Sequence, residues 1–102
     1  MARVSKARLI KVFEEAKRRI PDAELGYICF QLDECRDRAA ANMAKYLISR
    51  SLDGLVCFEW WAKHNNLENW RDYESHTKSG KRLRIRWINN AIRAIKKWEN
   101  YP

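Results

Sequence analysis

Hydrophobic side chains recur every three or four residues along most of the chain, which is the spacing of amphipathic helices. The first such stretch follows Ser5, a residue type that caps helix N-termini, and it stops at Pro21. Its apolar stripe consists of Leu9, Val12, Phe13, Ala16 and Ile20. The pattern therefore predicts a first helix with one face turned towards a core.

Two further helices are predicted in the middle of the chain. Residues 23–35 have helical spacing, with Leu25, Ile28, Cys29 and Leu32 on one face and Phe30 off it. Residues 27–30 alone also fit a short buried strand, but the polar residues that follow break any alternation, so a helix is favoured. A third helix is expected between the capping residue Asp37 and the Asp53-Gly54 turn. Its inner face would consist of Ala40, Met43, Ala44, Leu47 and Ile48.

The second half of the chain predicts a short helix, a loop and a long helix. The short helix covers residues 55–65, and the polar residues 67–80 are expected to form a long connecting loop. The last helix would extend from about Lys81 to Asn100, with an inward stripe of Ile85, Ile88, Ala91, Ile92 and Ile95. We therefore expect an all-α fold, a single domain over residues 1–102, built as a compact bundle of four to five helices with a long C-terminal helix.

Composition narrows the class of protein. The chain is 46% hydrophobic and 33% charged, with three Gly and two Pro, which disfavours both a disordered tail and a turn-rich β-sandwich. No run approaches the roughly 18 apolar residues of a membrane span. The basic first residues have no apolar stretch behind them, so no secretory signal is predicted and a cytoplasmic location is expected.

The three cysteines add little chemistry. They are Cys29, Cys35 and Cys57, an odd number, and Cys29 and Cys57 lie directly between apolar neighbours in the sequence. We expect reduced, buried thiols that act as small hydrophobic side chains.

Charge gives the sharpest functional signal. The formal net charge is +8, and residues 75–98 contain eight basic side chains and no acidic one. On a helical projection these include a strip about 80–180° away from Ile88, formed by Arg82, Arg86, Arg93, Lys96 and Lys97. Arginine forks suit phosphate, so the strip predicts a contact face for nucleic acid or for an anionic nucleotide ligand. The alternative is an ordinary solvated face, or one paired with the acidic middle of the chain.

Aromatic residues suggest two further kinds of contact. Trp60, Trp70 and Tyr73 are candidates for stacking on a base or a partner, with Arg71 as an additional cation, although the loop aromatics would equally cover the core. Leu83, Trp87 and Trp98 form a second apolar stripe on the last helix. Core packing is the favoured interpretation of that stripe, and an interface with a partner or a second copy is the alternative.

Motifs for catalysis, metal binding or cofactor binding are not found. The cysteines and histidines lack metal-ligand spacing, and no glycine-rich phosphate loop or nucleophile elbow occurs. We therefore predict no catalytic residue, no metal and no cofactor, and a protein that is not an enzyme.

Three patches together resemble short helical accessory proteins of tailed bacteriophages. The patches are residues 27–34, residues 52–54 with 58–61, and Arg86-Trp87-Ile88 with Ile92, within about residues 25–95. The resemblance implies a protein that modulates or inhibits a host or defence system by binding and transfers no catalytic residue. We expect the basic strip to bind an anionic partner. The alternatives are a general DNA- or RNA-binding protein, and an inhibitor of a host or defence protein or a homo-oligomer that uses the Leu83, Trp87 and Trp98 stripe.

Overall fold

The computed structural model describes residues 4–52, 54–65 and 74–99, and these contain five α-helices, one short 3-10 helix and no strand. The helices are α1 (Lys6–Arg19), η1 (Ile20–Asp22), α2 (Ile28–Asp33), α3 (Arg38–Ser49), α4 (Phe58–His64) and α5 (Lys78–Lys97). The predicted all-α class with a long C-terminal helix is therefore confirmed.

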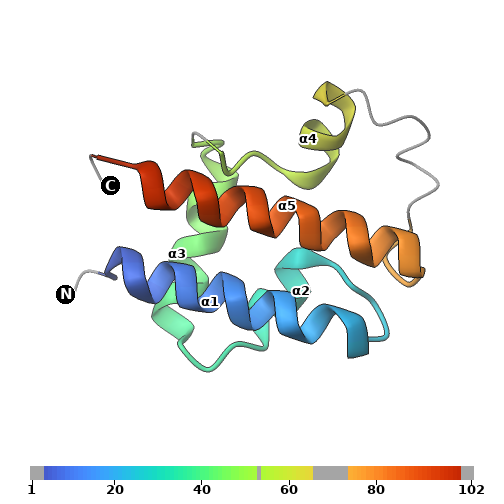
Figure 1. Cartoon of the computed structure of the whole chain (residues 1–102). Coiled ribbons are helices and arrows are strands. Elements are labelled where there is room, and N and C mark those ends of the chain that lie inside the picture. Colours follow the sequence, from blue (N-terminus) through green and yellow to red (C-terminus); the bar gives the residue numbers. More distant parts are fainter. Residues whose placement is uncertain (1–3, 53, 66–73, 100–102) are drawn as a thin grey trace.

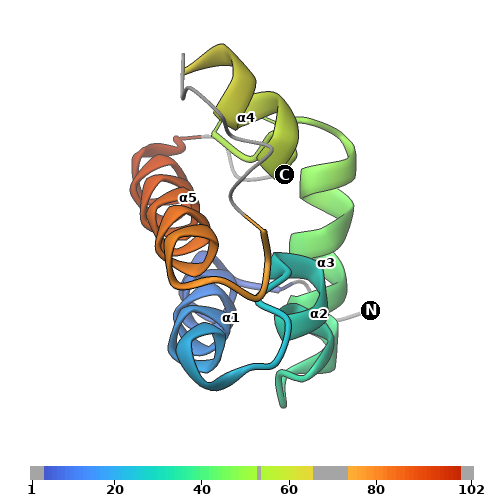
Figure 2. The same ribbon diagram turned by 90° about the vertical axis from the view of Figure 1, so that its right-hand side faces the viewer.

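Helices α1 and α5 lie side by side and run antiparallel, as Figure 1 shows. The Lys6 Nζ atom donates to the carbonyl of Trp98 at 2.7 Å, and the Lys81 Nζ atom donates to the carbonyl of Pro21 at 3.4 Å. These two contacts tie each end of α1 to the opposite end of α5. Helices α2 and α3 form a second layer behind this pair, and α4 lies at the end of the molecule away from α1 (Figure 2).

The first helix forms where the sequence predicts it. The Ser5 Oγ atom accepts a hydrogen bond from the Arg8 backbone N–H at 3.2 Å, and Pro21 lies in the 3-10 turn that ends the helix. All five residues of the predicted stripe are buried, namely Leu9, Val12, Phe13, Ala16 and Ile20. Local sequence signals are sufficient for this element.

The predicted second helix, residues 23–35, is wrong in extent, because only Ile28–Asp33 is helical. The Gly26 backbone N–H donates to the carbonyl of Ser75 at 2.7 Å instead of joining a helix. A Cβ atom at Gly26 would lie 2.9 Å from that same carbonyl oxygen, so a glycine fits this close approach. Leu25, expected on the inner face, is consequently exposed.

The starts of α4 and α5 also differ from the prediction, and α5 ends at Lys97 rather than near Asn100, with Trp98 as its C-cap. Helix α4 begins at Phe58, and Leu55 is buried in the non-helical segment before it. Helix α5 begins at Lys78 because the Thr77 side chain caps it, accepting from the Gly80 N–H at 3.0 Å. The predicted loop therefore ends before Lys78. Its first part, residues 67–73, lies outside the described residues.

One hydrophobic cluster contains residues from all the described helices. Trp87 is 2% exposed, its Nε1 donates to the Val56 carbonyl at 2.9 Å, and its ring lies 6.0 Å from that of Phe13. Leu83 is buried as well, whereas Trp98 is partly buried against the cluster. The interface predicted as the alternative for this stripe needs Leu83 and Trp87 at the surface, so the structure corrects it in favour of core packing.

The prediction of three buried thiols is correct only for Cys35. Cys29 and Cys57 are exposed, and all three are free. Cys29 is the second residue of α2, and Cys57 directly precedes α4. Apolar neighbours in the sequence were therefore a poor guide to burial at these two positions.

Candidate functional site

The cationic strip predicted on the last helix lies on the exposed side of α5. Arg82, Arg86, Arg93, Lys96 and Lys97 are all exposed, and we call these five residues the basic face. Ile88, Ile92 and Ile95 are buried on the other side of the helix. The amphipathic pattern of α5 thus holds five cations in solvent, on a rigid element of 20 residues.

Within the described ranges, no member of the basic face forms an ion pair with a carboxylate. The ion pairs there involve other cations, namely Arg8, Arg19, Arg38 and Lys45, and the remaining contact joins His76 to Glu74 at 4.0 Å. Arg93 donates to the Asn90 side chain, and the Arg86 guanidinium lies 5.7 Å from the centre of the Trp61 ring. These contacts orient the two arginines without neutralising them.

Helix α1 extends the cationic surface beside α5. The Lys17 Nζ atom donates to the Asn89 Oδ1 atom of α5 at 3.1 Å, so Lys17 lies at the border between the two helices. Since neither group of this contact is a carboxylate, the contact leaves the lysine charge in place. The paired arrangement of α1 and α5 therefore adds a cation alongside the basic face.

The aromatic candidates are only partly placed. Trp60 is 49% exposed on α4, and its ring stacks on that of His64 with centroids 3.7 Å apart and planes 13° from parallel. Trp70, Arg71 and Tyr73 lie outside the described residues. The structure thus shows one exposed, pre-stacked indole and does not test the loop candidates.

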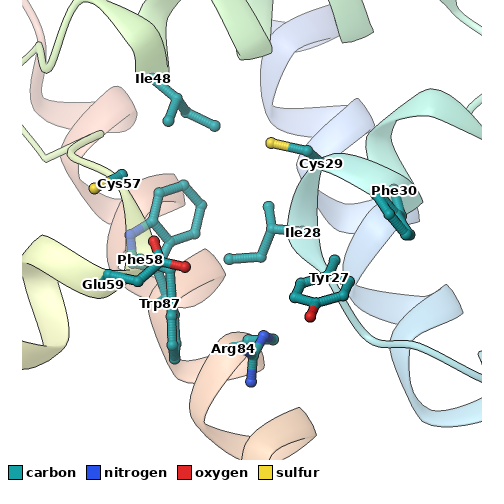
Figure 3. Close-up of a pocket in the computed structure, with 10 residues that line it drawn as sticks. All are labelled: Tyr27, Ile28, Cys29, Phe30, Ile48, Cys57, Phe58, Glu59, Arg84 and Trp87. Atoms are coloured by element: carbon teal, nitrogen blue, oxygen red, sulfur yellow. The ribbon is translucent and has the colours of Figure 1, made fainter. Parts of the chain in front are cut away.

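A second candidate site, which the sequence did not indicate, is an apolar pocket of about 400 Å³ (Figure 3). It lies between α2, the C-terminal part of α3, the start of α4 and α5. Its walls are largely hydrophobic and aromatic, and they include Ile28, Ile48, Phe58 and Trp87. Pockets of this size and character are common small-molecule sites.

The pocket contains one buried cation, Arg84, which is 6% exposed. Its guanidinium lies 4.3 Å from the centre of the Phe58 ring and 5.6 Å from that of Tyr27, and its Nη1 donates to the Gly80 carbonyl at 3.1 Å. Burial lowers the pKa of Arg84, and the nearby Glu59 carboxylate opposes that shift. In the sequence, Arg84 is one of the eight basic residues between positions 75 and 98, and its position about 40° from Ile88 on the helical projection places it within the apolar stripe.

A third candidate site is a hollow of about 570 Å³, which is polar and carries charges of both signs. Three arginines line it together with Glu15 and Asp22, the arginines being Arg18, Arg19 and Arg36. The Arg36 backbone N–H already donates to Glu15 at 3.3 Å, and Arg19 forms an ion pair of 3.9 Å with Glu34. Mixed charge makes this hollow a weaker anion site than the basic face.

Comparisons with known proteins found no matching family model, no matching curated sequence and no matching solved structure. The described part of the chain contains no group of three or more His, Cys, Asp or Glu side chains that could hold a metal ion. None of its helices combines the length and the apolar character that crossing a bilayer demands. The basic face and the pocket are the two features of the described residues that point to a binding function.

Proposed function

We propose that this chain is a non-enzymatic accessory protein of the phage type, which modulates or inhibits a host or defence system by binding the phosphate backbone of a nucleic acid through the basic face of α5. The supporting observation is that five exposed cations share one side of one helix, with no carboxylate partner among the described residues. Arginine and lysine side chains that project from a rigid helix suit phosphate contacts, which give affinity with little dependence on base sequence.

The length of the basic face favours a polymer over a mononucleotide. Arg82 and Lys97 are 15 positions apart on α5, which corresponds to roughly 22 Å at 1.5 Å per residue. One strand of duplex DNA rises about 3.4 Å per nucleotide, so the face matches a backbone of about six nucleotides. Helix α5 is exposed along this side, and the face is thus a ridge rather than a cleft around a small ligand.

The test is a binding titration at several salt concentrations. A fluorescently labelled duplex of about 20 base pairs would be titrated with the protein, and anisotropy would give the dissociation constant. If the five cations neutralise phosphates, the logarithm of the association constant should fall with the logarithm of salt concentration with a slope of about −4.5. A flat dependence on salt would contradict the proposal.

A matched pair of variants locates the contact. Arg86→Glu with Arg93→Glu should abolish measurable binding, because each change removes a cation and adds an anion beside the phosphates. Arg36→Glu with Arg50→Glu makes the same change in net charge on exposed arginines of the other layer, and should weaken binding much less. An equal loss of affinity in both double variants would show that binding depends only on the net charge of the protein. That result would overturn the assignment of the contact to the basic face.

A further inference from the structure

The pocket beside α2 combines an apolar interior with a charged group placed inside it. Ile28, Ile48 and Trp87 supply aliphatic and aromatic wall, and the Arg84 guanidinium is packed between aromatic rings at the same site. Figure 3 shows these side chains arranged around the cavity, with Cys29 and Cys57 on different sides of it. Such a site offers hydrophobic contact to most of a ligand and one fixed charge to the remainder.

We propose that this pocket binds a compact hydrophobic monocarboxylate, whose carboxylate pairs with Arg84 and whose apolar body packs against Ile28, Ile48 and Trp87. This activity is separate from nucleic acid binding. None of the five residues of the basic face lines the pocket, and Arg84 does not belong to that face.

The volume limits the size of the ligand. A cavity of about 400 Å³, at the ~30 Å³ that one water occupies in the liquid, accommodates roughly a dozen non-hydrogen atoms. This corresponds to a bicyclic aromatic acid or to a medium-chain fatty acid. A long-chain lipid or a dinucleotide would extend far beyond the walls.

The charge of the ligand follows from the position of Arg84. A guanidinium has five N–H groups in a fixed fork, and two N–H groups of such a fork can hold a carboxylate. One of the N–H groups of Arg84, on Nη1, donates to the Gly80 carbonyl. Burial disfavours the Arg84 cation and lowers its pKa, so an anion beside it recovers part of that cost. Glu59 also lines the pocket but is exposed, which weakens its repulsion of a ligand carboxylate.

The mouth of the pocket is aromatic and open to solvent. Tyr27 and Phe30 are 42% and 53% exposed, and their rings contact each other edge to face at 5.0 Å. Two large aromatic side chains in solvent next to an apolar cavity are typical of a ligand-binding surface. A ligand that entered the pocket would remove part of this apolar area from water.

Two ligands of the same shape and different charge test the proposal. The probes are 1-naphthoate and its neutral isostere 1-acetylnaphthalene, titrated into the protein by calorimetry. We expect 1-naphthoate to bind at least roughly tenfold more tightly, since hydrogen bonds to charged groups contribute most in a desolvated site. Equal affinity for the two probes, or no binding of 1-naphthoate, would overturn the proposal.

Two variants separate the charge from the cavity. Arg84→Met keeps the length of the side chain and removes its charge, so it should lose the preference for 1-naphthoate while still binding both probes. Cys57→Trp fills the cavity from its wall and should abolish binding of both.

The Arg86→Glu with Arg93→Glu protein, which is expected not to bind nucleic acid, should bind 1-naphthoate as the unmodified protein does. Loss of binding there would place the probe on the basic face and refute the assignment to the pocket.

Alkylation of the two exposed thiols maps the site without any substitution. Cys29 and Cys57 both line the pocket, so saturating 1-naphthoate should slow their reaction with iodoacetamide at least severalfold, as followed by peptide mass spectrometry. The neutral isostere at the same concentration should slow it less. Unchanged rates at both thiols under saturating 1-naphthoate would show that the probe binds elsewhere, and would overturn the proposal even if Arg84→Met failed to fold.

Discussion

Two arginines that are two positions apart on α5 show how one side-chain type acquires two different environments. Arg86 is exposed on the basic face, whereas Arg84 is 6% exposed and packed against Phe58. A separation of two residues turns the helix by about 200°, so the two guanidinium groups point in nearly opposite directions. Helical position thus decides which cation meets solvent and which lines the pocket.

Gly54 is the residue whose replacement should be most costly for its size. Its φ is +84°, a left-handed conformation that side chains rarely adopt, and a Cβ atom there would overlap the Cβ of Ala94 on α5. Gly54→Ala should therefore lower the free energy of unfolding by about 2–4 kcal/mol, from backbone strain together with overpacking. Urea denaturation followed by circular dichroism measures this loss.

The two contributions at Gly54 can be separated with a second substitution. Ala94→Gly removes the overlapping methyl group, so the Gly54→Ala, Ala94→Gly double variant should recover the overpacking part of the loss and retain the backbone part. If the losses of unfolding free energy in the two single variants simply add in the double variant, the Ala94 methyl group does not contact a side chain at position 54. An unchanged unfolding midpoint for Gly54→Ala would contradict the positive φ itself.

At the scale of helices, one bidentate ion pair links α1 to the start of α3. The Arg8 Nε and Nη2 atoms lie 2.8 and 2.7 Å from the two carboxylate oxygens of Asp37. Asp37 also caps α3, accepting from the Ala40 N–H at 3.1 Å. The hydrogen bonds from Arg8 and from the Ala40 backbone lower the pKa of Asp37 to about 2. The ion pair with Arg8 requires the ionised carboxylate of Asp37, and the hydrogen bond from Ala40 is stronger when that carboxylate is ionised.

This pair predicts a dependence of stability on acidity. The unfolded chain has an Asp pKa of about 4, above that of folded Asp37, so the stabilisation is complete above pH ~4 and is lost as the pH falls towards 2. Asp37→Asn keeps a capping oxygen and removes the charge. Thermal midpoints measured at several pH values should therefore fall less steeply with acid in Asp37→Asn than in the unmodified protein. If the thermal midpoints of the two proteins fall in parallel as the pH is lowered, the Asp37 carboxylate does not contribute to the acid dependence of stability.

Helices set by local signals were predictable from the sequence, and contacts between distant segments were not. Ser5 and Asp37 act as the caps that the sequence indicates, and the isoleucine stripe of α5 is buried as expected, apart from the partly buried Ile85. The start of α2 depends on the bond from Gly26 to Ser75, a partner 49 residues away along the chain. No local pattern encodes such a contact, so the second helix was predicted too long.

The basic face and the pocket differ in the same respect, since one was predictable from the sequence and the other was not. The basic face follows from the period of one helix, so the sequence alone indicated all five of its residues. The pocket draws its walls from α2, α3, α4 and α5, and its existence depends on how these helices pack. Only the position of Arg84 within the apolar stripe was visible beforehand, and a buried cation is unusual enough to have been a signal.

At the scale of the whole molecule, charge is arranged unevenly between the two layers. The ion pairs of Asp33 with Arg38 and Lys45, and of Asp37 with Arg8, lie at α2 and α3, whereas the basic face is on the exposed side of α5. A protein with a net charge of +8 attracts any anion, and this arrangement groups five cations without a carboxylate partner among the described residues on one side. An approaching polyanion would accordingly be steered towards α5.

The three cysteines provide a measure of how the whole fold opens. Cys35 is 2% exposed, its Sγ lies 3.3 Å from the Gln31 carbonyl, and burial raises its pKa to about 11. Alkylation needs an accessible thiolate, so Cys29 and Cys57 should react with iodoacetamide in the folded protein while Cys35 reacts only after opening. The rate at Cys35, followed by peptide mass spectrometry, should rise with urea in proportion to the unfolded fraction. The exposed Cys57 serves as the internal control for reagent activity. Reaction at Cys35 as fast as at Cys57 without denaturant would show that α1, α2 and α3 do not enclose this thiol, and would contradict the packing of the core described above.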